Sequence, residues 1–226
     1  MTSKQNLPTL AILGGTGKEG PGLAMRWAKA GYPIIIGSRQ TEKAQAVAAE
    51  LNQKLNINSI RGLQNSAAAR QAEICVLTVV FTAHQAALEG LKDALKGKIL
   101  VDTTARVDFR QPDPPPPPSA ARIAQDILGE DVPVVAAFQS VPAAALRRNL
   151  DQPLDEDVLI CADDLSAAEV VSTLAESIGL TPYYAGDLDN AIVVEGMTSL
   201  LISLNKYYKS RTASIRVTGI DRESGG

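Results

Sequence analysis

Three glycines near the N-terminus have the spacing of a phosphate-binding turn. Gly15, Gly17 and Gly20 follow the apolar run 9–13 and precede a stretch whose apolar residues recur at helical intervals. In a G-x-G-x-x-G turn the first glycine permits the bend, the second lets the backbone approach a pyrophosphate, and the third lets helix and strand pack closely. Unpaired N–H groups at the helix start also favour an anion. The pattern predicts a dinucleotide pyrophosphate site; the alternative is a glycine-rich turn without a ligand.

The end of the next apolar run carries a hydroxyl and two cations. Ser38 and Arg39 follow the run 34–37 directly, and Lys43 lies about one helical turn further on. A protein selective for NAD places an acidic residue here to accept hydrogen bonds from ribose hydroxyls. A hydroxyl and cations would instead neutralise a 2′-phosphate. These residues predict NADP(H) rather than NAD(H), although Lys43 by itself is equally compatible with a solvated surface charge.

Alternating strand and helix patterns surround these two turns. We expect an α/β fold of the Rossmann type, with a doubly wound and mostly parallel sheet. Strands are expected at 9–13, 34–38, 57–60, 73–80, 98–102 and 133–137, and helices from Gly20 and at 41–55, 65–72, 83–95 and 119–128. Thr41 and Ser119 are the candidate caps of two of these helices.

The carboxyl end of the fourth strand should face the dinucleotide. In the doubly wound order this strand lies beside the first, across the point where dinucleotides bind. Thr78, Val79, Val80 and Phe81 are therefore expected at the site. The loop 138–145, after the sixth strand, lies at the same edge, and its small residues leave room for a flat ring.

The last third of the chain is expected to form a smaller C-terminal α/β extension. We place a dinucleotide-binding domain at 1–148 and this smaller unit at 149–226, with strands at 157–162 and 182–185 and helices at 166–178 and 190–208. The last helix carries a broad apolar surface, which predicts either a homodimer interface or burial within the chain. The polar end, 211–226, is expected to be loosely held.

A run of prolines interrupts the alternating pattern at 112–118. Consecutive prolines fix φ and remove hydrogen-bond donors, which predicts a polyproline II segment at the surface. A rigid loop beside the site is the favoured interpretation, and recruitment of a proline-reading partner is the alternative.

Composition limits the possible functions. The formal net charge is −3 and the pI near 5.3, so nucleic acid is not an expected partner. Without a long apolar run or an apolar leader, we expect a cytoplasmic protein that does not enter membranes. Cys75 and Cys161 lie in apolar runs and are expected to be buried free thiols. With His84 as the single histidine, no metal site is expected; we predict that it is satisfied and partly exposed rather than catalytic.

Several motifs together resemble one family of reductases. They are the string Leu13-Gly14-Gly15-Thr16-Gly17, the Gly37-Ser38-Arg39 strand end with Lys43, the 135–139 segment with Pro142-Ala143, and the helix around Glu195. This set resembles the NADPH-dependent F420 reductases, or F420H2:NADP oxidoreductases. The resemblance implies hydride transfer in a homodimer, between nicotinamide C4 and C5 of the deazaflavin in coenzyme F420.

The resemblance also implies roles for individual residues. Thr16, Gly17, Lys18 and Glu19 would wrap the pyrophosphate, whereas Ser38, Arg39 and Lys43 would hold the 2′-phosphate. The nicotinamide would be flanked by Thr78, Val79, Val80 and Ala143. The deazaflavin would be flanked by Phe81, Gln139, Val141 and Pro142.

The chain departs from the family pattern at the predicted deazaflavin site. Gln139 stands where members often carry His, and Val80-Phe81 replaces a Pro-Trp pair. A glutamine can hydrogen-bond a polar ring edge but cannot change charge near neutral pH. Basic residues are expected near the acidic groups of F420; the candidates are Arg106, Arg110, Arg147, Lys206 and Arg211.

No catalytic side chain is expected, because cofactors carry the hydride chemistry themselves. Two alternatives stay open. One is an NADPH-dependent reductase of another small acceptor, such as a flavin, an imine or a ferric chelate. The other is a non-catalytic protein that senses NADP(H).

Overall fold

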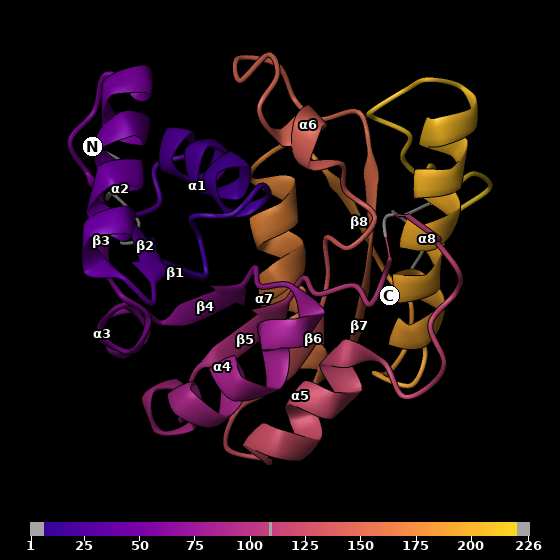
Figure 1. The fold of residues 1–226 in the computed structure, drawn as a ribbon, viewed down its shortest axis with the longest axis horizontal. Helices are drawn as coiled ribbons and strands as arrows, with labels where there is room; N and C mark the ends of the chain where they lie inside the picture. Colours follow the sequence, from indigo (N-terminus) through magenta and orange to yellow (C-terminus); the bar gives the residue numbers. More distant parts are fainter. Residues whose placement is uncertain (1–6, 109, 221–226) are drawn as a thin grey trace.

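In the part of the chain that the structure describes, eight strands form one sheet in the order β3-β2-β1-β4-β5-β6-β7-β8. The computed structural model describes residues 7–108 and 110–220 (Figure 1). The strands are β1 (Leu10–Leu13), β2 (Ile34–Ser38), β3 (Ile60–Gln64), β4 (Ile74–Leu77), β5 (Ile99–Asp102), β6 (Val134–Ala136), β7 (Asp157–Ala162) and β8 (Thr181–Tyr184). Strands β1 to β6 are parallel to one another. Strand β7 is antiparallel to β6, and β8 is parallel to β7. The predicted mostly parallel, doubly wound sheet is confirmed.

Helices cover both faces of this sheet. They are α1 (Gly20–Lys29), α2 (Thr41–Leu55), α3 (Asn65–Arg70), α4 (Phe81–Leu95), α5 (Ala120–Leu128), α6 (Ala143–Leu146), α7 (Leu165–Glu176) and α8 (Ala191–Tyr207). One apolar cluster joins the sheet to α1, α2, α6 and α7, and the other joins it to α3, α4, α5 and α8. The central strands are apolar throughout because both of their faces are covered.

Trp27 of α1 connects distant parts of the chain. Its ring is fully buried, and its Nε1 donates to the backbone oxygen of Leu174 in α7 at 2.9 Å. It also meets the ring of Phe138 edge-on, with the centroids 5.6 Å apart. A buried indole needs such a partner for its N–H. The first helix is thereby fixed against both α7 and the loop that follows β6.

Two strands differ from their predicted bounds by more than one residue. Strand β3 begins at Ile60, where the prediction ended, because the Asn52 side chain bonds both the N–H and the C=O of Ile60, at 3.0 and 2.8 Å. Further along, a Cβ at Gly62 would lie 2.4 Å from Ala44, so this glycine lets α2 lie close to the strand. Strand β4 ends at Leu77 rather than residue 80, because α4 already begins at Phe81.

The two predicted helix caps have different outcomes. Ser119 caps α5, since its Oγ accepts from the N–H of Arg122 at 3.0 Å. The prediction for Thr41 is wrong. The N-cap of α2 is Gln40, which makes no side-chain capping bond, and Thr41 is the first helical residue.

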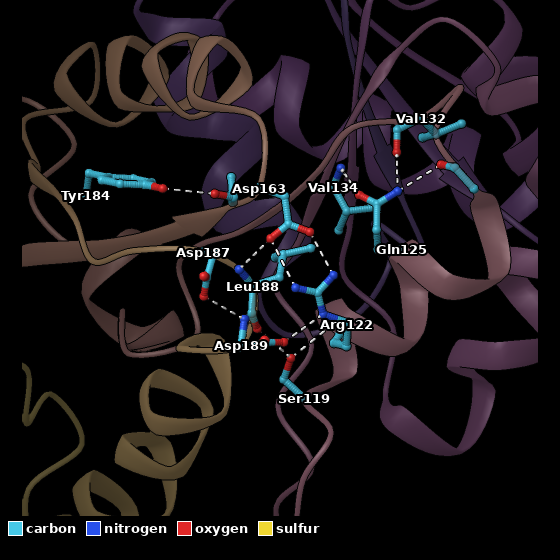
Figure 2. A network of polar contacts seen from close by, with 12 residues as sticks. Ser119, Arg122, Gln125, Val132, Val134, Asp163, Tyr184, Asp187, Leu188 and Asp189 are labelled. Carbon is cyan, nitrogen blue, oxygen red and sulfur yellow. Dashed lines mark hydrogen bonds and ion pairs between the residues drawn. The ribbon is translucent and has the colours of Figure 1, made fainter.

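A polar network ties α5 to the C-terminal strands (Figure 2). Arg122 makes two bonds to the Asp163 carboxylate after β7, at 2.7 and 3.0 Å, and one to Asp189 after β8, at 3.0 Å. Asp163 also accepts from the N–H of Leu188 at 3.0 Å. Because β7 pairs with β6 and β8 pairs with β7, both strands continue the main sheet. The division into units at 1–148 and 149–226 stays a prediction.

The polar C-terminal segment is held where it passes the start of β7. Asp157 N–H donates to Ile215 O at 3.2 Å, and Val217 N–H donates to the Asp157 carboxylate at 2.5 Å. The prediction of a loosely held end is therefore wrong for this stretch. Residues 221–226, to which it also applied, lie outside the described residues.

Both cysteines are free and buried, as predicted. Burial raises the pKa of the Cys75 thiol to about 12 and that of Cys161 to about 11, which keeps both protonated at neutral pH. Within residues 7–108 and 110–220, no helix combines the length and apolarity that crossing a membrane requires. The same residues hold no cluster of His, Cys, Asp and Glu suited to a metal ion.

Candidate functional site

A cleft of about 1120 Å³ opens at the carboxyl edge of the sheet. Segments that follow β1, β4, β5 and β6 form its walls, and α8 with the residues after it closes one side. Among its lining residues are Gly17–Glu19, Thr78–Thr82, Thr103–Asp108, Arg110, Gln139–Ala144, Thr198, Leu201, Ile202, Asn205, Arg211 and Ala213. The parallel strands place these segments together because their carboxyl ends meet at one edge.

Most of the predicted site residues line this cleft, and a smaller group does not. Those that line it are Gly17, Lys18, Glu19, Thr78, Val79, Val80, Phe81, Gln139, Val141, Pro142 and Ala143. Those that lie outside it are Gly15, Thr16, Ser38, Arg39 and Lys43. The second group belongs to the turn after β1 and to the end of β2.

The three glycines of the first turn have different surroundings. A Cβ at Gly15 would lie 2.6 Å from the backbone oxygen of Ile12, and one at Gly20 would lie 2.6 Å from the Cα of Gly15. At Gly17 the nearest atom to an added Cβ would be 3.8 Å away. Close packing therefore requires Gly15 and Gly20, whereas Gly17 leaves open space at the cleft.

Hydrogen bonds connect the glycine turn to the end of β2. Gly15 N–H donates to Gly37 O at 2.9 Å, and Gly14 N–H donates to Asn65 Oδ1 at 3.1 Å. Asn65 was not foreseen from the sequence as part of the site. The feature that could have identified it is its position at the start of α3, directly after β3.

The residues predicted to bind the 2′-phosphate lie at the carboxyl end of β2 and just after it, beyond Gly37. The Ser38 side chain is buried, and its Oγ accepts from the N–H of Gln40 at 3.2 Å. Arg39 and Lys43 are exposed, and neither makes an ion pair with another described residue. Two cations without partners thus lie near a buried hydroxyl.

Glu19 carries a carboxyl group at the predicted binding site of the pyrophosphate, which is itself an anion. It is the N-cap of α1, and its Oε2 lies 3.3 Å from Thr103 Oγ1 at the end of β5. Thr103 Oγ1 also lies 3.0 Å from Leu77 O, which can only accept. Because a threonine hydroxyl has a single proton, Thr103 satisfies both contacts when the carboxyl group of Glu19 donates.

The surroundings of Glu19 favour that protonated form. Burial raises the pKa of Glu19 to about 8 and the charge of Asp102 adds to the rise, whereas the Thr103 hydroxyl opposes it when it donates to the ionised carboxylate. Its Oε1 is buried and has no hydrogen-bond partner among the described residues. A neutral carboxylic acid therefore lies at the cleft at neutral pH.

His84 and Asp102 form a buried pair beneath the cleft. His84 Nε2 lies 2.6 Å from Asp102 Oδ2, and neither side chain has exposed surface. The expectation that His84 is partly exposed is wrong, because α4 begins at Phe81 and turns His84 towards β5. It does not line the cleft, and its Nδ1 is buried without a hydrogen-bond partner among the described residues, so the expectation that it is satisfied holds only for Nε2.

The loop after β6 aims Gln139 at the end of β5. Phe138 has a φ of 73°, an uncommon conformation for a residue with a Cβ. After this sharp turn, Gln139 Nε2 donates to Asp102 O at 2.9 Å, while its Oε1 is buried without a partner among the described residues. Thr198 of α8 donates to Gln139 O at 3.0 Å. Neither Asp102 nor Thr198 was identified from the sequence.

Buried Arg26 of α1 supports the rest of this loop. Its guanidinium donates to the backbone oxygens of Leu146, Arg148 and Gln152, at 3.1, 2.6 and 2.6 Å. Nothing in the sequence indicates this role, because a single arginine within an apolar helix is typical of a surface charge.

Arg106 and Glu195 form an ion pair beside the cleft. Glu195 Oε1 accepts from both the backbone N–H and the Nε of Arg106, at 2.8 and 2.7 Å, while its Oε2 accepts from Ala120 N–H at 2.8 Å. The guanidinium carbon lies 5.5 Å from the centroid of the Phe81 ring. The pair joins α8, the start of α5 and the wall of the cleft.

The five candidate cations are now distinguished by position. Arg106, Arg110 and Arg211 line the cleft. Arg147 donates to the backbone oxygens of Gly17 and Lys18, and so braces the glycine turn. Lys206 donates to Arg110 O at 3.0 Å.

A family model and several curated relatives of this chain belong to one family. Residues 9–106 match the family model described as NADP oxidoreductase, coenzyme F420-dependent. An F420-dependent NADP reductase of Methanothermobacter marburgensis is 39% identical over 222 residues, which cover 93% of this chain and 98% of that protein. The protein of the same name from Methanocaldococcus jannaschii is 39% identical over 228 residues, which cover 94% of this chain and 99% of that one.

A solved structure extends the agreement to the fold. The crystal structure of a protein described as a putative F420-dependent NADP reductase from Arthrobacter sp. FB24 superposes with a TM-score of 0.78 at 25% identity. It covers 94% of this chain and 100% of its own. With this fold, this cleft and relatives of this similarity over nearly the whole length, the chain belongs to the family of coenzyme F420-dependent NADP oxidoreductases.

Proposed function

We propose that this protein transfers a hydride between C4 of the nicotinamide of NADP(H) and C5 of the deazaflavin of coenzyme F420. It is an NADP-dependent oxidoreductase by family. The observation that carries the proposal is that one continuous cleft, of about 1120 Å³, joins the glycine turn, the end of β4 and the loop after β6. Such a space can hold two flat rings against each other.

The residues present fit NADP(H). Gly17 leaves space for close approach of a pyrophosphate, which Thr16, Lys18 and Glu19 would surround. Ser38, Arg39 and Lys43 would hold the 2′-phosphate, because two unpaired cations and a hydroxyl suit its charge. Thr78, Val79, Val80 and Ala143 would flank the nicotinamide.

The residues present also fit a deazaflavin. Phe81 is 39% exposed and offers a ring face, and the free Oε1 of Gln139 offers an acceptor to a polar ring edge. Val141 and Pro142 would complete this side of the site. The two coenzymes supply the hydride donor and acceptor, so the protein contributes positioning and exclusion of water.

We also propose that the protein is a homodimer. The apolar surface of α8 is divided, with Val194 and Leu201 in the core and Val193, Leu200 and Tyr207 at 58, 61 and 81% exposure. Exposed apolar surface of this kind favours a second copy. A cytoplasmic location and the absence of nucleic-acid binding stay predictions from composition.

Sedimentation equilibrium tests the dimer. We expect Leu200→Asp to shift the protein to monomers, because an unpaired carboxylate would be buried at the interface. The matched control is Val170→Asp, which adds the same charge to an apolar residue 37% exposed on α7. A Leu200→Asp protein of unchanged mass in solution would contradict this surface as the interface.

The activity is tested by mixing the protein with NADPH and F420 and following the absorbance of oxidised F420. We expect it to bleach with NADPH and far more slowly with NADH. Flavin, imine and ferric chelate serve as competing acceptors in parallel. Turnover of one of these without F420 turnover would refute the proposal in favour of another reductase. Tight NADPH binding without oxidation by any acceptor would instead identify a sensing protein.

A further inference from the structure

We propose that Arg106 is a catalytic residue that places a fixed positive charge beside the ring accepting the hydride, and that Glu195 is its positioning residue. This inference rests on the proposed function, whose family resemblance assigned neither role. It also gives the proline run a role, because a backbone oxygen of that run accepts a hydrogen bond from Arg106.

Arg106 differs from the other cations of the cleft in its burial. Among the described lining residues, Lys18, Arg110 and Arg211 are exposed, whereas the Arg106 side chain is 12% exposed. Water screens an exposed charge strongly and a buried one much less. Of these cations, Arg106 can therefore act most strongly on charge that develops inside the cleft.

Glu195 fixes the direction of that charge. It is 1% exposed and does not line the cleft, whereas Arg106 does. Arg106 is therefore the member of the pair at the cleft, and its guanidinium carbon lies 5.5 Å from the ring of Phe81, which also lines the cleft. Because Oε1 also takes the Arg106 backbone N–H and Oε2 takes Ala120 N–H, the carboxylate cannot swing away without breaking contacts to three donors.

The proline run also holds the guanidinium, through a second of its nitrogens. Arg106 Nη2 donates to Pro116 O at 2.5 Å, and Ser199 of α8 donates to Asp113 O at 2.9 Å. Consecutive prolines fix φ, so this carbonyl is held in place by a stiff segment. Arg106 is thus held by both α8 and residues 112–118.

Phe81 places the guanidinium next to the acceptor. Its ring lines the cleft, is assigned to the deazaflavin in the proposed function, and lies 5.5 Å from the guanidinium carbon. In the reaction a C–H bond of NADPH breaks and the hydride forms a new C–H bond on the acceptor. NADPH becomes NADP⁺, the acceptor gains the electron pair with its negative charge, and water supplies the proton that neutralises it. A cation already in position stabilises this charge without reorganisation.

The test compares single-turnover rates of F420 bleaching, measured by stopped flow at saturating NADPH. We expect Arg106→Gln to lower the rate roughly ten- to a hundredfold, below the full effect of a preorganised donor because Glu195 offsets part of the charge. Arg106→Lys should recover part of the loss. Glu195→Gln should lower the rate by a smaller factor, since an amide oxygen still accepts a hydrogen bond.

Arg122→Gln is the matched control. It removes another partly buried arginine that pairs with carboxylates, but away from the cleft, at Asp163 and Asp189. We expect it to change thermal stability and leave the hydride-transfer rate within about twofold. The NADPH dissociation constant, measured by fluorescence for every variant, should also change by less than about twofold.

The outcomes separate this inference from the function on which it rests. An unmodified protein that never bleaches F420 would refute the proposed function and the role of Arg106 with it. An active protein whose Arg106→Gln variant keeps its rate, or loses only affinity for F420, would overturn this inference alone. An equal loss of the hydride-transfer rate in Arg122→Gln would also overturn this inference. If Glu195→Gln does not fold, the Arg106 variants decide.

Discussion

Nε2 of His84 lies 2.6 Å from Oδ2 of Asp102, in a place where neither side chain touches solvent. Asp102 ends β5, its Oδ1 accepts from Thr104 N–H at 3.0 Å, and its backbone oxygen receives the Gln139 amide at 2.9 Å. One aspartate therefore fixes α4, the segment after β5 and the loop after β6. The pair supports the floor of the cleft without lining it.

Replacing Asp102 by alanine should strongly destabilise the protein. The change leaves His84 Nε2 and Thr104 N–H buried without partners, and each buried group left unsatisfied costs about 1 to 3 kcal/mol. Chemical denaturation measures the free energy of unfolding. The control is Asp93→Ala, which removes an exposed carboxylate paired with Lys96 and should leave the free energy of unfolding nearly unchanged. Equal losses in the two variants would show that the buried pair has no special role.

The sequence was sufficient to predict the order and type of the main elements. Strands such as β1 and β4 are short apolar runs between helical patterns, and this signal depends only on local periodicity. The start of β3 was wrong because it depends on two non-local features, the Asn52 side chain and the close approach of α2 at Gly62. Periodicity carries no information about either.

The candidate site was predictable where a motif implies backbone geometry. The glycine turn, the end of β4 and the loop around Gln139 do lie at one edge, because parallel topology requires it. Asp102, Thr198 and Glu195 were not assigned to the site, since their contacts join segments far apart in the sequence. Only the packed fold shows which polar side chains meet.

Gly17 and Gly20 should respond differently to alanine. At Gly20 the added methyl would lie 2.6 Å from the backbone of Gly15, and overpacking of this kind costs about 1 to 3 kcal/mol. At Gly17 there is room for it in the free protein. We therefore expect Gly20→Ala to lower the melting temperature. Gly17→Ala should keep it and weaken NADPH binding by at least about tenfold, or ~1.4 kcal/mol.

Calorimetric unfolding and NADPH titration measure the two effects on the same samples. Gly97→Ala is unsuitable as a control because its φ is +70°, whereas Gly90→Ala adds a methyl to open space on α4. Unchanged NADPH affinity in Gly17→Ala would show that the pyrophosphate does not approach this turn.

Arg39→Ala should weaken NADPH far more than NADH. A charged contact to phosphate contributes roughly 1.5 to 3 kcal/mol, or about ten- to a hundredfold in affinity. NADH lacks the 2′-phosphate, so its affinity should be nearly unchanged. The control is Arg61→Ala, which removes an exposed arginine of β3 that bonds Gln71. Equal losses for both nucleotides would contradict a phosphate contact at Arg39.

Glu19→Gln should change how stability depends on pH. Because the pKa of Glu19 rises from 4.5 to about 8 on folding, the folded protein keeps a proton between these values that the unfolded chain has lost. The stabilising contribution is complete below pH 4.5 and is lost as the pH rises towards 8. Glutamine preserves the shape without the ionisation, so the variant should gain stability relative to the unmodified protein across this window.

Denaturant titrations at intervals from pH 5 to 8.5 measure this difference in unfolding free energy. NADPH titrations should show the same trend, since a Glu19 carboxylate formed above pH 8 would repel the pyrophosphate in the unmodified protein and not in Glu19→Gln. Glu50→Gln, which removes an exposed carboxylate from α2, is the control. A constant difference between Glu19→Gln and the unmodified protein at every pH would mean that Glu19 is already charged in the folded state, and that the Thr103 hydroxyl donates to it.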